Sequence, residues 1–194
     1  MHALKDYLGE ETVNQILRDM IAAYGFQGPP YPTTRDFISI IRSHAAPEYQ
    51  DLITDLFEKI VLFDLRADDS SYRQLPDGSF EVTINVAATK FEADGQGQDT
   101  TVPLDLRIDI AVLGEEDEAT KQPAVLYMEK QRIMLQTQSF TVQVPTRPVS
   151  VGIDPFNKLI DRNPDDNTRR LGDEGVVSEL TGSTAGENAL QTGP

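Results

Sequence analysis

The chain has 194 residues, a formal net charge of −15 and no cysteine. Without cysteine, disulfides and thiolate metal sites are excluded. The negative charge repels phosphate backbones and anionic membrane surfaces, so we expect neither nucleic acid binding nor direct membrane insertion. No apolar run approaches the roughly 18 residues that a membrane-spanning helix needs, and residues 1–6 lack the apolar part of an export signal.

Residues 1–59 show the spacing of α-helices. In residues 3–24, apolar side chains share one helical face: Val13, Ile16, Leu17, Met20 and Ile21. We expect Gly25 to end this helix in a left-handed conformation. Further helices are predicted from Thr33 or Thr34 and from Pro47, which suits a first helical position. Residues 1–59 are therefore predicted to be a segment of three to four helices.

After Lys59 the apolar residues alternate with polar ones, which is typical of strands. The predicted strands cover residues 60–65, 80–88, 102–112, 124–133, 139–144 and 149–153. Short turns without helices connect them, so residues 60–167 are predicted to form an antiparallel sheet or β-sandwich. Residues 168–194 are polar, and we expect a disordered tail. The predicted fold class is α+β: helices, then antiparallel β-structure, then the tail.

The side chains that catalysis and metal binding require are scarce. His2 and His44 are the only histidines, and they are too far apart to share one helical face. The sequence has no Gly-x-Ser-x-Gly motif, and Gly95-Gln96-Gly97 lacks the third glycine of a dinucleotide-binding loop. We expect no catalytic residue, no cofactor-binding residue and no metal ligand in this chain.

Residues 151–167 form the most distinctive stretch. Asp161, Asn163 and Asp165 match positions one, three and five of a calcium loop. However, Asp166 stands where that loop needs glycine, and Gly172 stands where it needs glutamate. Whether this stretch binds a cation is left open.

A structural interpretation of the same stretch fits better. Asp154-Pro155 is typical of a cap followed by the first turn of a helix. Three apolar side chains of that short helix would dock on the core: Phe156, Leu159 and Ile160. Asp161 and Arg162 would pair with each other or hold backbone groups.

Two segments resemble parts of the zinc aminopeptidases of the aminopeptidase N family. Residues 3–13 are similar to the helix that follows the catalytic site, and Tyr24-Gly25 and residues 34–43 fit the same stretch. Residues 152–167 resemble the C-terminal ending of a bacterial branch, in which an aminopeptidase-like module is fused to, or encoded with, an ABC-transporter permease. The residues that carry this second resemblance are Gly152, Ile153, Asp154, Pro155, Asp161, Arg162, Asn163, Asp165 and Asp166.

The resemblance implies a C-terminal part of a longer, membrane-linked protein. The family's His-Glu-x-x-His zinc motif is missing here, and its expected place is before Met1. Zinc and catalysis would then belong to an upstream peptidase-like domain. This chain would be the non-catalytic partner that supports it, facing outside the cytoplasm at the cell membrane.

Two other functions stay open. An independent β-sandwich would present strand edges and aromatic residues such as Tyr72 and Tyr127 to protein or peptide partners. A carboxylate-based hydrolase would need acidic side chains that converge in a pocket and have raised pKa values. The candidates for that role are Asp64, Asp105, Asp109 and Asp154.

Overall fold

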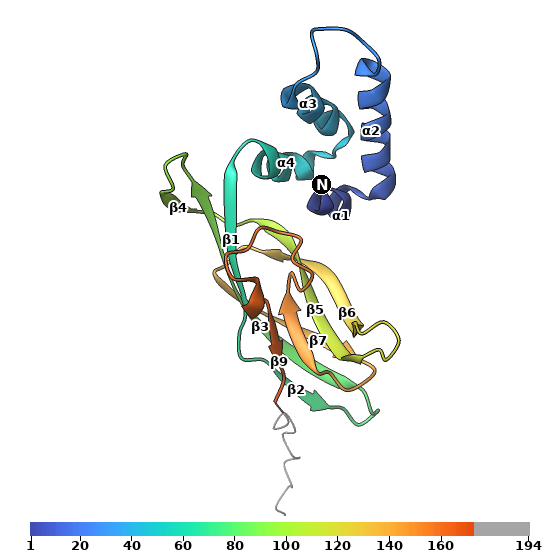
Figure 1. Ribbon diagram of the computed structural model, residues 1–194. Coiled ribbons are helices and arrows are strands. Elements are labelled where there is room, and N and C mark those ends of the chain that lie inside the picture. Colours follow the sequence, from blue (N-terminus) through green and yellow to red (C-terminus); the bar gives the residue numbers. More distant parts are fainter. Residues whose placement is uncertain (173–194) are drawn as a thin grey trace, which may run out of the picture.

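The computed structural model describes residues 1–172. Four α-helices come first: α1 (His2–Leu8), α2 (Glu10–Tyr24), α3 (Thr34–His44) and α4 (Gln50–Phe57), with a 3-10 turn η1 (Pro47–Tyr49) before α4. Antiparallel sheets follow, which confirms the predicted α+β class. Figure 1 shows the helices at one end of the molecule and the strands at the other, with the N-terminus at the boundary between them.

The helices, which we call the helical segment (residues 2–57), have a small core of their own. Its buried side chains are Leu4, Val13, Ile16, Ile38, Ile41 and Ile53. Thr33 and Asp36 form a capping box at the start of α3, because the Thr33 N–H donates to Asp36 at 2.7 Å. Gly25 is extended, not left-handed as we expected. Glycine is needed there for another reason: a Cβ would lie 2.5 Å from the Ile21 carbonyl oxygen.

The long strand β3 (Phe80–Ala93) is the centre of the first sheet. β1 (Ile60–Ala67) and β2 (Ser71–Gln74) pair with one side of it, and β4 (Asp99–Val102) and β7 (Thr137–Val144) pair with the other. The two sides follow from the registers, because β1 and β7 both pair with Val86 and Ala87 of β3.

The second sheet has the order β6 (Pro123–Ile133), β5 (Leu106–Glu116), β8 (Ser150–Ile153) and β9 (Thr168–Arg170). A 3-10 turn, η2 (Pro164–Asp166), precedes β9. The two sheets face each other as a sandwich (residues 60–170) and bury side chains of both in one core. This core includes Leu65, Val82, Ile84 and Val86 from the first sheet and Ile108, Ile110, Val112, Val151 and Ile153 from the second.

The strands β1, β3 and β5 run beyond the predicted ends at residues 65, 88 and 112. Three further differences concern whole elements. The strand predicted for residues 102–112 is divided between β4 and β5 around Pro103, which has no N–H to donate. The short strand β2 was not predicted. Thr168–Arg170, which we expected to be disordered, pair with β8. The rest of the predicted tail, residues 173–194, lies outside the described residues.

The short helix predicted after Asp154 is a turn. Asp154 has a φ of 45°, and its carboxylate accepts the backbone N–H groups of Lys158 at 3.0 Å and Leu159 at 2.8 Å. A carboxylate that takes these donors competes with helical hydrogen bonding. Leu159 is buried as predicted, but Phe156 and Ile160 are exposed.

Candidate functional site

Four charged side chains join α1 to the sandwich: Asp6, Asp109, Lys130 and Lys158. We call them the junction cluster. The Lys158 ammonium group donates to Asp6 Oδ1 and to Asp109 Oδ2, each at 2.6 Å. Lys130 donates to Asp109 Oδ2 at 2.9 Å and also to Asp6. Because the four come from α1, β5, β6 and the turn after β8, they cross-link four separate segments.

Tyr7, next to Asp6 on α1, completes this contact. Its hydroxyl donates to the Arg107 carbonyl oxygen at 2.5 Å, and the Lys130 ammonium group lies 4.7 Å from the centre of its ring. Burial, together with the nearby carboxylates of Asp109 and Asp154, raises the pKa of Tyr7 far above its ordinary value. The phenol therefore stays protonated and acts as a hydrogen-bond donor.

The electrostatics of the cluster favour ion pairs. Burial alone would raise the pKa of Asp6, but its bonds to Lys130 and Lys158 outweigh burial and hold that pKa below its ordinary value. Burial would lower the pKa of Lys158, but Asp109 and Asp6 outweigh it and raise that pKa. The pKa of neighbouring Asp154 is raised by its burial and by the charge of Asp109.

The residues singled out in the sequence between Gly152 and Asp166 hold the end of the sandwich together. We call them the 152–166 motif. A Cβ on Gly152 would lie 3.0 Å from both the Asn167 carbonyl oxygen and Thr168 Cγ2, so glycine permits this close approach. The Ile153 side chain is fully buried, and its N–H donates to the same Asn167 oxygen at 2.9 Å. Pro155 borders Gly152 as well, with its Cβ 3.2 Å from that Cβ position.

Asp161 holds backbone groups, as we expected. Its carboxylate accepts the N–H of Leu65 at 3.0 Å and that of Asn163 at 2.9 Å, and the residue forms a parallel bridge with Phe63 on β1. Burial raises the pKa of Asp161. This segment therefore runs beside the edge of β1 and links the end of the second sheet to the first.

The remaining residues of the 152–166 motif do not have the arrangement of a calcium loop: Arg162 and Asn163 contact other side chains of the protein. Arg162 pairs with Asp99 and lies 4.6 Å from the ring centre of Phe91. The Asn163 side-chain amide donates to Asp166 at 2.7 Å, and Asp165 is exposed. Among residues 1–172, no three His, Cys, Asp or Glu side chains come together in a way that could hold a metal ion.

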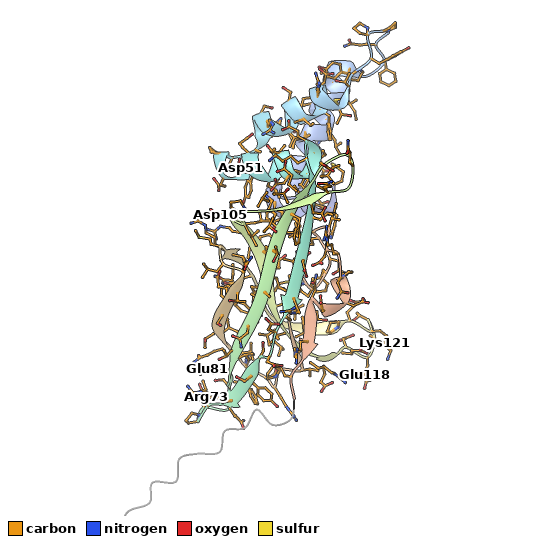
Figure 2. All side chains as sticks on the ribbon, turned by 90° about the vertical axis from the view of Figure 1, so that its left-hand side faces the viewer. Asp51, Arg73, Glu81, Asp105, Glu118 and Lys121 are labelled. Atoms are coloured by element: carbon orange, nitrogen blue, oxygen red, sulfur yellow. The ribbon has the colours of Figure 1, made fainter. Side chains whose placement is uncertain are left out.

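Beside the junction cluster, a pocket of about 560 Å³ lies between the helical segment and the sandwich. We call it the junction pocket. η1 and α4 contribute Glu48, Tyr49 and Asp51, and the start of β5 contributes Arg107. Figure 2 shows Asp51 on the helical side and Asp105 below it, on the same flank of the molecule.

The junction pocket contains both paired and free charges. Asp55 pairs with Lys90, and Arg132 binds both oxygens of Asp105, at 2.6 and 2.7 Å. Three other charged groups of the lining have no hydrogen bond or ion pair among residues 1–172: Glu48, Asp51 and Arg107. All three residues are exposed to solvent, and the charge of Asp51 also contributes to the raised pKa of Lys59 in the same pocket.

The four carboxylates considered for hydrolysis do not meet in a pocket. Asp64 and Asp105 are exposed, and Asp109 and Asp154 are buried. The buried pair accepts lysine and backbone donors, and neither residue lines the junction pocket. The sequence pattern did not identify the lysines of the cluster, because Lys130 and Lys158 carry no local signal of their distant partners.

Comparisons with known proteins add no relatives. No protein-family model matches the chain, and no match is found among curated proteins. Within residues 1–172, no helix has the length and apolar character needed to cross a membrane. A proposal for the function therefore starts from the geometry of the chain.

Proposed function

We propose that this chain is a non-catalytic accessory region that binds another protein domain through its helical segment. The observation that carries the proposal is a run of exposed apolar side chains on α2 and the loop after it. Leu17 is 40% exposed, Ile21 63%, Tyr31 71% and Phe26 fully exposed. Figure 1 shows this loop at the end of the molecule that is farthest from the sheets. Exposed apolar groups gathered in one region are typical of protein interaction surfaces.

The proposed partner is the upstream peptidase-like domain that the resemblance implies. Zinc and catalysis would belong to that domain, and the parent protein would be membrane-linked with this region outside the cytoplasm. The junction cluster supports an accessory role, because two ion pairs of Asp6 fix α1 to the sandwich, and Asp109 holds the same two lysines in place. A domain bound to the helices would then keep a defined orientation relative to the sandwich.

The test is calorimetric titration of the chain with the separately produced polypeptide that is encoded before Met1. We expect saturable binding that Ile21→Ser and Phe26→Ser each weaken by about tenfold or more. Arg73→Gln, at the far end of the sandwich (Figure 2), should leave the affinity unchanged. Absence of binding by the wild-type chain would refute the proposed partner. Zinc-dependent cleavage of aminoacyl-anilides by this chain alone would refute its non-catalytic role.

A second candidate is an independent interaction module that uses the edge of β6. This strand has 11 residues and, within residues 1–172, pairs with β5 alone, while Val125 and Met128 are exposed along it. A free edge of this kind can accept an extended peptide as an additional strand. Tyr72 does not contribute to such a surface, since it is buried and its hydroxyl accepts a bond from Arg147 at 3.2 Å. Specific binding of an unrelated peptide, abolished by Val125→Lys, would favour this candidate.

A further inference from the structure

We propose that the junction pocket binds a small zwitterion in which an apolar body separates a cationic group from an anionic group. Its volume of about 560 Å³ lies within the range of small-molecule sites. This binding site is separate from the apolar surface on α2 and the following loop, so it does not depend on the proposed function.

The free charges of the pocket define the two ends of the ligand. Glu48 and Asp51 belong to η1 and α4 on the helical wall, and Arg107 belongs to β5 on the sheet wall. None of the three has a hydrogen bond or ion pair within the described part of the chain. All three residues are exposed, so water solvates them when no ligand is bound. A cation could pair only with the carboxylates, and an anion only with Arg107. A zwitterion provides a partner for each wall.

Part of the lining of the junction pocket is apolar and can contact the body of the ligand. Tyr49, Leu52, Pro103 and Leu106 line it. The ring of Tyr49 meets the ring of Tyr7 edge-on, with 6.4 Å between their centres, so the two aromatic side chains fix one another. Eight of the fourteen lining residues are charged, so the apolar contacts of the ligand are limited to these side chains and Tyr7.

The other charges of the pocket are already neutralised. Asp55 and Lys90 form a largely buried pair, with 13% and 16% of their side chains exposed. Arg132 and Asp105 pair through two hydrogen bonds, and Lys59 pairs with Glu92 at 2.7 Å. These pairs shape the walls and leave recognition of a charged ligand to Glu48, Asp51 and Arg107.

The test is a titration of the full chain, followed by its backbone-amide NMR signals. Three ligands of equal length are compared: ε-aminocaproate, which carries both charges, hexylamine, which has only the cation, and caproate, which has only the anion. We expect ε-aminocaproate to bind about fivefold more tightly than either single-charge ligand, with shifts centred on the pocket residues. Absence of saturable binding by ε-aminocaproate, or equal affinity for all three, would overturn the proposal.

Charge-removing variants assign each end of the ligand. Asp51→Asn should weaken ε-aminocaproate and hexylamine by about fivefold, and Arg107→Gln should weaken ε-aminocaproate while leaving hexylamine unchanged. Glu118→Gln and Lys121→Gln make the same changes of net charge in the β5–β6 loop, away from the pocket (Figure 2), and should have no effect. If the controls weaken binding as much as the pocket variants, the attraction is only that of the chain's net charge and the proposal fails.

Discussion

The helical segment and the sandwich differ in the size of the buried core that stabilises each of them. Among residues 1–172, the core of the sandwich contains 18 buried residues, and the core of the helical segment contains six. Two residues of the helices, Tyr7 and Leu52, belong to the sandwich core. Short helices with few buried side chains are marginal without tertiary packing. We conclude that the sandwich supports the helical segment and that the reverse support is small.

The two regions can be separated experimentally, and the largest effect is expected in the sandwich core. Ile84 is fully buried there, and Ile84→Ala should lower the free energy of unfolding by about 3 kcal/mol. If the helices depend on the sandwich, amide exchange should accelerate in both regions. Exchange that accelerates in the strands alone would show that the helices are independent.

The matched change in the helical core is Ile16→Ala, also at a fully buried position. It should accelerate exchange in the helices and leave most of the sandwich protected. This control distinguishes one-way support from a single cooperative unit, because a single unit would respond alike to both changes.

The junction cluster is the next point at which the two regions can be separated. Asp109→Ala leaves Lys130 and Lys158 with Asp6 as their only carboxylate partner in the cluster. We expect the free energy of unfolding to fall by about 2–3 kcal/mol, because removing the partner of a buried charge is costly. Partial exposure of the lysines keeps the loss from being larger. Denaturant unfolding measures this loss, and exchange in α1 should accelerate most. Unchanged exchange in α1 would contradict a docking role for the cluster.

A smaller effect is expected on β8, the strand that precedes the turn with Lys158. Gly152→Ala would place a Cβ 3.0 Å from Asn167 and Thr168, so β8 and β9 must shift apart. Crowding of this kind costs about 1–2 kcal/mol. Thermal unfolding should show the loss, while Gly95→Ala, where a Cβ meets no atom within 4 Å, should show much less.

The smallest effect is the pH dependence that the cluster contributes. The pKa of Asp6 is lowered from its ordinary value of 3.8 in the folded chain. Its contribution is therefore complete above the unfolded pKa and is lost as the pH falls through the folded pKa. Asp154 acts in the opposite direction, because its pKa is raised. Stability measured from neutral pH to below pH 3.8 should fall less steeply in Asp6→Asn than in the wild type, and equal slopes would contradict this assignment.

Local periodicity was sufficient to predict the elements that bury a regular face. Alternation at Val82, Ile84 and Val86 predicted β3 and its inward side, and the spacing of Val13 and Ile16 predicted the core side of α2. In both cases burial repeats with the geometry of the backbone, so neighbouring residues carry the information.

Contacts between distant residues could not be predicted in this way. Asp109 lies among apolar residues on β5 and looks like a solvent-facing position. It is buried, because Lys158 and α1 cover it from segments 49 and about 100 residues away in the chain. The charges of the junction pocket carry no local signal either, since Glu48 and Arg107 come to line the same pocket only through the docking of the helices on the sheet.

The central position of β3 has a consequence for how the chain folds during its synthesis. β1 and β2 precede β3 and can pair with one of its sides as soon as it leaves the ribosome. Its other side must wait for β4 and for β7, which ends at Val144. Until then a long strand with one apolar face keeps one edge open, and such an edge is prone to wrong pairing with a neighbouring chain. During synthesis, the risk of mispairing is therefore greatest between the release of Ala93 and that of Val144 from the ribosome.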